Sequence, residues 1–183
     1  MGTIGEKTDM KQEMLNGLME RRSVRAYQPK QITEEELTAV LRAGQYAPTG
    51  KNRMPVQFVV IQNPELLARL SKWNASIMGA DIDPFYGAPT AVLVLADRTV
   101  PTYAADGALA MGNLMNAAYA VGLGSCWINR AREMFESAEG KALLEEWGLS
   151  ERYAAIAFCI LGYAAEALPA PSPRREDQIV YLR

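Results

Sequence analysis

Basic side chains gather in four short segments of a chain whose formal net charge is -2. The richest segment is RRSVR at residues 21–25, which holds three arginines and one serine. The other three segments are Lys51 with Arg53, Arg130 with Arg132, and Arg174 with Arg175. Arginine offers planar donors suited to phosphate oxygens, and a serine hydroxyl adds a further donor. The segments could therefore converge on one small anion, unless they are four unrelated patches of solvated surface.

The composition excludes several kinds of catalytic site. The chain has no histidine, which removes Ser-His-Asp and Cys-His nucleophilic sites, HExxH zinc sites and the usual general base. Its two cysteines, Cys126 and Cys159, stand in apolar surroundings and are predicted to be small core residues rather than a disulfide or a metal site. We therefore expect no metal site and name no catalytic side chain. The chemistry would then belong to a bound cofactor.

Charge balance and hydropathy exclude two classes of partner. Lys and Arg number 19 against 21 for Asp and Glu, and the sequence pI is near 5.3, so no overall basic field attracts nucleic acid. The N-terminus lacks the apolar region of a signal peptide, and the longest apolar run, AAIAFCILGYAA, is shorter than the roughly 18 residues that span a bilayer. We expect a cytoplasmic protein with no membrane partner. Its length suits one domain over residues 1–183.

Helical periodicity predicts five helices that must position these residues. The first has Thr8 and Asp9 as candidate caps and ends at about Glu20, just before the arginines. The other four are expected after the capping box of Thr33 and Glu36, after Asn63 and Pro64, at residues 105–122, and at residues 138–148. Residues 105–122 are small and apolar nearly all round. This composition suits a helix enclosed on every side, either within a monomer or at a subunit interface.

Strands and loops alternate with the helices. Apolar runs at residues 56–62, 89–97 and 153–163 predict buried strands, and SCWI at residues 125–128 is expected to be short and extended. Residues 47–55 read as a loop. The tail from about residue 165 onward has prolines at 169, 171 and 173 and should be an extended arm, whose end, IVYLR, has strand character. GLGSCW lacks the third glycine of a dinucleotide fingerprint and follows a helix, so the pattern is α/β or α+β without a Rossmann motif.

Five segments together resemble the nitroreductase family of FMN-dependent NAD(P)H oxidoreductases, in its short bacterial type. They are RRSVRAYQP, AGQYAPTGKNRMP, DPFYGAPTAVLVLAD, DGALAMGNLMNAAYAVGLGSCWI and LGYAAEALPAPSPRR, in the family's order and spacing. The resemblance implies an α+β fold with a central, mostly antiparallel sheet flanked by helices. It also implies a homodimer with two FMN sites built from both subunits. The C-terminal arm would wrap the partner and add a strand to its sheet.

The resemblance also implies which residues would bind the cofactor. The FMN phosphate and ribityl chain would be held by Arg21, Arg22, Ser23 and Arg25. Arg174 matches an arginine of the arm that reaches the same phosphate, with Arg175 as a neighbouring candidate. The loop that approaches the flavin from the other subunit is matched by Pro48, Thr49, Gly50 and Asn52. The segment that passes the isoalloxazine, with backbone N–H groups directed to N5 and O4, is matched by Trp127, Ile128, Asn129 and Arg130.

Two departures from the family loop concern the substrate pocket. Met54 and Val56 stand where Gln and Trp are common. Lys51 is a candidate to favour the negative charge that a reduced flavin gains near N1 and O2.

The implied reaction is ping-pong: NAD(P)H delivers hydride and leaves, and a nitroaromatic, quinone or related small-molecule acceptor then takes the same place. Two alternatives remain. One is a flavoenzyme of the same fold with other reductive chemistry, such as dehalogenation or enone reduction. The other is a non-catalytic FMN-binding or regulatory protein, its flavin face blocked by Trp127 or Met54.

Overall fold

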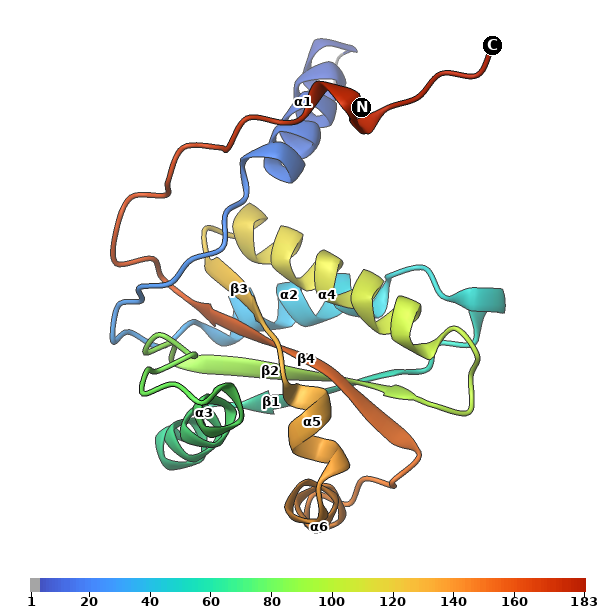
Figure 1. The fold of residues 1–183 in the computed structure, drawn as a ribbon. Helices are drawn as coiled ribbons and strands as arrows, with labels where there is room; N and C mark the ends of the chain where they lie inside the picture. Colours follow the sequence, from blue (N-terminus) through green and yellow to red (C-terminus); the bar gives the residue numbers. More distant parts are fainter. Residues whose placement is uncertain (1–3) are drawn as a thin grey trace.

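A computed structural model of the chain describes residues 4–183, with side chains from residue 12 onward, and places one antiparallel sheet between helices (Figure 1). The strands are β1 (Val56–Ile61), β2 (Thr90–Asp97), β3 (Gly124–Ile128) and β4 (Tyr153–Gly162). Their order is β1-β2-β4-β3, and each neighbouring pair is antiparallel. The expected α+β fold with a central antiparallel sheet is confirmed.

The position of each strand in the sheet decides its burial. The central strand β2 is buried from Thr90 to Ala96, because helices cover both of its faces. The prediction of a buried strand at residues 56–62 is wrong in part, since β1 lies at the sheet edge and Val60 is 37% exposed. An edge strand packs against one neighbour alone, and strand order is not written in the run of apolar residues.

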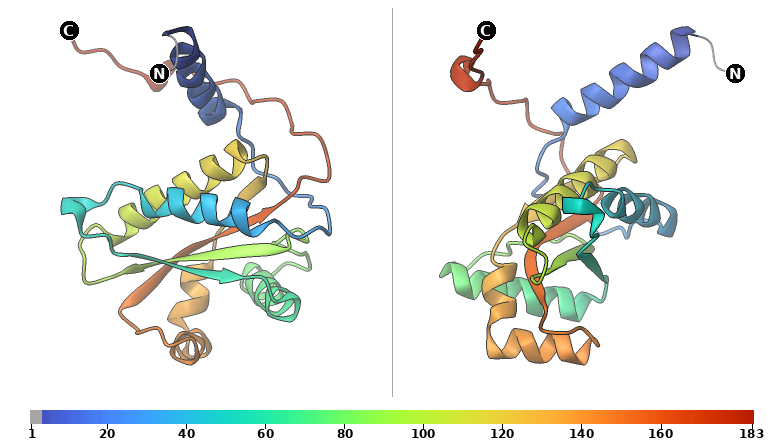
Figure 2. Two further views of the ribbon diagram at one scale, coloured as in Figure 1. Left: turned by 180° about the vertical axis from the view of Figure 1, so that it is seen from behind. Right: turned by 90° about the vertical axis from the view of Figure 1, so that its right-hand side faces the viewer.

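The helices form two layers, one on each face of the sheet (Figures 1 and 2). One face carries α2 (Glu34–Gln45) and α4 (Tyr103–Ala120), and the other carries α3 (Pro64–Met78), α5 (Ala131–Glu136) and α6 (Ala138–Glu146). Leu114 of α4 lies in the first apolar core, and Phe158 of β4 lies at the centre of the second. Cys126 and Cys159 are buried, as predicted.

Local capping signals explain where α2 and α3 begin. The Thr33 side chain accepts from the Glu36 N–H at 3.2 Å, and the Glu36 carboxylate accepts from the Thr33 N–H at 2.7 Å, which is the predicted capping box. The Asn63 side chain caps α3 by accepting from the Leu66 N–H, and Pro64 stands at the first position of this helix. The predicted start of the first helix is wrong, because α1 (Ile4–Glu20) begins four residues before Thr8. α5 has no counterpart among the predicted helices, since six residues are too few to show a period.

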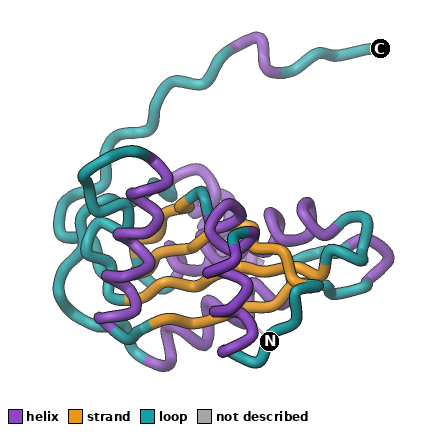
Figure 3. The backbone as a smooth tube through the Cα atoms, turned by 60° about the horizontal axis from the view of Figure 1, so that its bottom comes forward, coloured by secondary structure: helices purple, strands orange, loops and turns teal. Residues whose placement is uncertain are grey.

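Both ends of the chain project from the body of the molecule (Figure 2), and Figure 3 shows the C-terminal arm extending away from it. Residues 166–183 are exposed throughout and extended, apart from one 3-10 turn at Glu176–Gln178. The prediction of an extended arm is confirmed, whereas its last five residues form no strand in the single chain. Met14 on α1 is 72% exposed and Leu182 on the arm is 95% exposed. In a single chain, these apolar side chains are therefore exposed to solvent.

The long apolar helix α4 is not enclosed on every side within one chain. Ala110, Met111, Leu114 and Ala118 are fully buried, but Leu109 is 48% exposed. Of the two environments considered for this helix, enclosure within a monomer is therefore excluded. Among the helices of the described residues, none is long and apolar enough to cross a membrane.

Candidate functional site

The arginine-rich segment runs along the edge of the sheet beside β3. Ser23 forms an isolated parallel bridge with Ser125, and the Val24 N–H donates to the Ser125 carbonyl at 3.0 Å. Further along, the Gln28 N–H donates to the Tyr163 carbonyl at 2.9 Å, just beyond the end of β4. The Tyr27 hydroxyl donates to the Val24 carbonyl at 3.0 Å and closes the segment on itself. These contacts fix the backbone that carries the arginines.

Three of the predicted phosphate-binding side chains converge around Cys126 on β3. Burial raises the pKa of the Cys126 thiol, and the charges of Arg25 and Arg21 and a hydrogen bond with Ser23 act in the opposite direction. The Nη1 atom of Arg21 is buried and has no hydrogen-bond partner within the described residues. A buried guanidinium donor without an acceptor destabilises the fold, so binding of an anion that accepts from it would be favourable.

Arg22 takes a different direction from its two neighbours. Its Nη1 atom donates to the carbonyls of Met19 and Arg21, both at 2.8 Å. Its Nε atom donates to the carbonyl of Pro169 at 3.2 Å. In the single chain, Arg22 therefore caps the end of α1 and tethers the start of the arm.

The predicted loop at residues 48–54 lies beside the start of α4, held by a buried carboxylate. Asp106 is 3% exposed and accepts from the Gly50 N–H at 3.0 Å and from the Thr102 hydroxyl at 2.8 Å. The side chain of Thr49 accepts from the Met54 N–H at 3.1 Å. Pro48 is exposed. The loop is thus built into the fold rather than left free.

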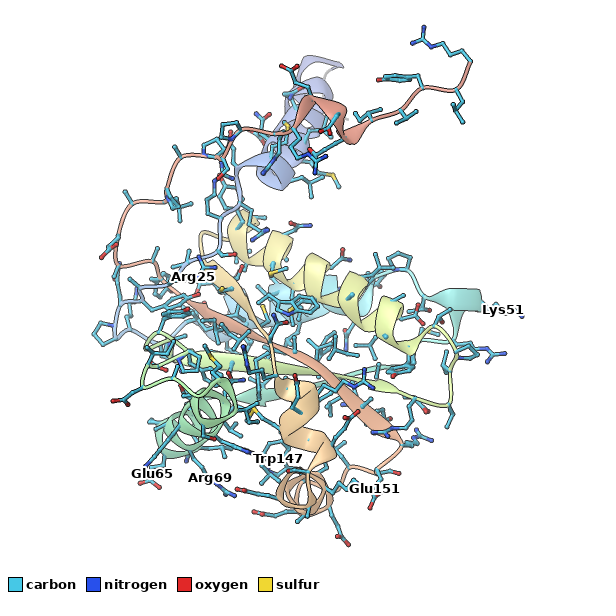
Figure 4. All side chains as sticks on the ribbon, viewed as in Figure 1. Arg25, Lys51, Glu65, Arg69, Trp147 and Glu151 are labelled. Carbon is cyan, nitrogen blue, oxygen red and sulfur yellow. The ribbon has the colours of Figure 1, made fainter. Side chains whose placement is uncertain are left out.

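The loop also holds a strained backbone. Lys51 and Asn52 both have φ of 54°, and Met54 has φ of 47°. Each such residue costs about 1–3 kcal/mol, and clustered strain of this kind is typical of ligand-binding segments. Figure 4 shows Lys51 and Arg25 at opposite sides of the molecule. One chain therefore does not bring this loop to the arginine segment.

Replacing Gly50 by alanine should destabilise this loop. The added Cβ would lie 2.4 Å from the Oγ1 atom of Thr102, which cannot move freely because it donates to Asp106. We expect a loss of about 1–3 kcal/mol, which lowers the melting temperature by about 2–4 °C per kcal/mol. Gly17→Ala is the control, since its Cβ would meet Tyr119 at an ordinary 3.6 Å. Equal melting temperatures for Gly50→Ala and the unchanged protein would contradict the observed packing.

The predicted flavin-facing segment forms a turn between β3 and α5. The Trp127 indole donates to the Asn129 side chain at 2.5 Å, and the Asn129 carbonyl accepts from the Asn74 side chain at 2.7 Å. Arg130 has φ of 73°, in the left-handed region. Ile128 is 7% exposed and packs in the core, so it can act at a surface site through its backbone alone.

The remaining basic residues differ in whether they pair with a carboxylate. Arg175 forms two hydrogen bonds to Asp177, at 2.8 and 2.6 Å, and Arg132 pairs with Glu136 at 2.8 Å. Arg174 is exposed, on the arm that projects from the body of the molecule (Figure 1). The single chain therefore brings together three of the predicted phosphate-binding residues, and it leaves Arg174 apart from them.

Two polar residues of this region are missing from the sequence prediction. Asp106 was visible as a lone carboxylate in the first turn of an otherwise apolar helix, which is a signal for a buried partner. Asn74 lies on α3, 55 residues before the carbonyl that it contacts, and nothing in its local sequence marks it.

Two cavities of the molecule have no arginine in their walls. One, of about 840 Å³, lies between α3 and the segment before β2, and none of the predicted site residues line it. The other, of about 450 Å³, lies between α2, the 48–54 loop and β1, with Thr49, Met54 and Val56 in its wall. We give more weight to the second, because it includes both positions that depart from the family loop.

The comparisons with known proteins agree along nearly the whole chain. Residues 18–84 and 79–163 match the sequence profile of the nitroreductase family. A protein of Archaeoglobus fulgidus, provisionally named an NADH dehydrogenase/NAD(P)H nitroreductase, is 31% identical over 160 residues, or 83% of this chain and 86% of the relative.

Solved structures give the same result. A nitroreductase with bound FMN from Bacteroides fragilis superposes with a TM-score of 0.85 and 30% identity, over 93% of this chain and 99% of that one. A nitroreductase with bound FMN from Desulfitobacterium hafniense gives a TM-score of 0.84 and 25% identity, over 93% and 98% of the two chains. These proteins share the fold of the chain over nearly its whole length.

Proposed function

Because the chain belongs to the nitroreductase family, we propose that it is an oxidoreductase that binds FMN and uses NAD(P)H to reduce a nitroaromatic, a quinone or a related small acceptor. The observation that carries this proposal is the buried Nη1 atom of Arg21, which has no partner within the described residues. Ser23 and Arg25 lie around the same point of β3. Two guanidinium groups and a hydroxyl form a donor set suited to a phosphate monoester, so the residues present fit FMN.

The complete site requires a second copy of the chain, and we propose a homodimer. The 48–54 loop and Arg25 lie at opposite sides of one chain (Figure 4), so the loop would serve the partner's cofactor. Exposed apolar side chains occur on α1, on α4 and on the arm, where Val180 and Leu182 are 80% and 95% exposed. A partner would cover these side chains, and the arm would carry Arg174 to its phosphate site.

The residues of the chain would bind and orient the cofactor. FMN, when bound, would supply the redox chemistry by accepting hydride from NAD(P)H and passing it to the acceptor. Arg21, Ser23 and Arg25 would hold the phosphate, and the backbone N–H groups of residues 127–130 would face the ring. Lys51 of the partner's loop would place a positive charge near the ring. No side chain is required as a proton donor, since the acceptor can take protons from water.

Steady-state kinetics test this function. If NAD(P)H and the acceptor use one position in turn, initial rates at several fixed acceptor concentrations will give parallel double-reciprocal lines. The chain has no Rossmann fingerprint to hold nicotinamide elsewhere while the acceptor binds. In an anaerobic stopped-flow experiment, NAD(P)H alone should remove the yellow colour, and a nitroaromatic or a quinone should restore it.

Each other outcome of this experiment has a distinct meaning. Intersecting lines would show a ternary complex and a second binding position, contrary to the proposal. A yellow protein whose colour no nicotinamide removes would favour a non-catalytic FMN-binding protein. A protein that stays colourless after incubation with FMN would overturn the proposal itself.

A further inference from the structure

The carboxamide of Asn74 is buried beneath the turn between β3 and α5. Asn74 is fully buried on α3, and its Nδ2 atom donates to the Asn129 carbonyl at 2.7 Å. The same atom lies 3.5 Å from the sulfur of Met134. The Oδ1 atom has no hydrogen-bond partner within the described residues. One strong contact, to a backbone carbonyl on another element, thus accounts for the polar side chain here.

This contact fixes the direction of one peptide group. In a planar trans peptide, the carbonyl and the following N–H point in opposite directions. The Asn129 carbonyl points toward the buried Asn74, so the Arg130 N–H points away from α3. This N–H has no hydrogen-bond partner in the described part of the chain. It is therefore free to donate to a ligand that lies over the turn.

The turn is held from its other side as well. The Trp127 indole donates to the side-chain oxygen of Asn129 at 2.5 Å, so this oxygen and the backbone carbonyl of Asn129 are both engaged. Arg130 has φ of 73° and ψ of 2°, a left-handed conformation that a non-glycine residue adopts only where its surroundings enforce it. Two side chains from different elements thus maintain one strained peptide.

Asn74 is a poor choice if stability alone is considered. A buried acceptor without a partner is destabilising, and an apolar residue of the same shape would avoid that cost. Positions that break a local rule in this way are expected at functional sites.

We propose that Asn74 is a positioning residue, which directs the Arg130 N–H at N5 of the flavin ring through its hydrogen bond to the Asn129 carbonyl. The inference rests on the proposed function, because it requires FMN to lie over this turn. Asn74 itself would not touch the cofactor.

The test compares FMN with 5-deaza-FMN, in which a C–H group replaces N5 and cannot accept a hydrogen bond. The full-length protein should bind FMN about tenfold more tightly than the analogue, as one hydrogen bond of ordinary strength provides. In Asn74→Leu and in Asn74→Ala, the ratio of the affinity for FMN to the affinity for the analogue should fall to near one, as measured by fluorescence titration. The preference is a ratio, so general weakening of the protein cancels from it.

Ser71→Ala is the matched control. Ser71 is 7% exposed on the same helix, one turn before Asn74, and donates to Asp83 rather than to the turn. This variant should keep the tenfold preference even if its melting temperature falls. If both Asn74 variants keep the preference, or if the unchanged protein binds FMN and the analogue equally, the inference is wrong. Failure of the unchanged protein to bind FMN at all would instead overturn the proposed function.

Discussion

Arg21→Ala will weaken FMN binding by about 10- to 100-fold, the value expected for one charge-assisted hydrogen bond of about 1.5–3 kcal/mol. The Nη1 atom of Arg21 is already buried and without a partner in the described residues, so a phosphate would meet a donor that no other group satisfies. Affinity is measured by titrating the apoprotein with FMN and following the quenching of flavin fluorescence.

Riboflavin provides the first control for this experiment, because it lacks the phosphate. Its affinity should be the same for Arg21→Ala and for the unchanged protein. Arg69→Ala provides the second, since Arg69 on α3 is 53% exposed and pairs with Glu139 on α6, apart from Arg25 (Figure 4). If the Arg21→Ala variant retains full FMN affinity, Arg21 does not bind the phosphate and has a structural role only.

Deletion of residues 169–183 will convert the proposed dimer to a monomer and release most of its flavin. The deletion removes Arg174, the exposed apolar residues Ile179 to Leu182, and the Pro169 carbonyl that accepts from Arg22. In a symmetric dimer each subunit contributes one arm, so the deletion would remove buried apolar surface from both subunits at once. Sedimentation velocity measures the mass, and the ratio of flavin to protein absorbance measures the cofactor content.

Arg174→Ala in the full-length chain separates the two effects of the deletion. This variant keeps the arm, so it should remain a dimer, and it should lose FMN affinity because one phosphate donor is missing. A truncated protein that stays dimeric and yellow would contradict the role proposed for the arm.

Features that depend on neighbouring residues could be predicted from the sequence. The capping box of Thr33 and Glu36 spans three residues, and the hydrogen bonds that define it form wherever a helix begins there. The continuous apolar run of β2 likewise predicted a buried strand, which the structure confirms. The candidate phosphate segment was found because RRSVR is compact and matches a family pattern.

Features that depend on tertiary contacts could not be predicted. The contact between Arg22 and the arm depends on the carbonyl of Pro169, 147 residues further along the chain. The conformation of the 48–54 loop is set by Asp106, 56 residues away from Gly50. The exposure of β1 follows from strand order, which the apolar run at residues 56–62 does not encode. In each case the decisive partner lies outside the window in which periodicity and capping act.

Burial of the two cysteines bears on how electrons can leave the protein. Burial raises the pKa of Cys159 to about 12 and also raises the pKa of Cys126, so at neutral pH both sulfurs remain protonated and poorly nucleophilic. Exchange with glutathione and alkylation both require the thiolate and access to it. The two cysteines therefore offer no second redox couple that could take electrons from the flavin. The activity of the protein should not change with the ratio of reduced to oxidised thiol around it.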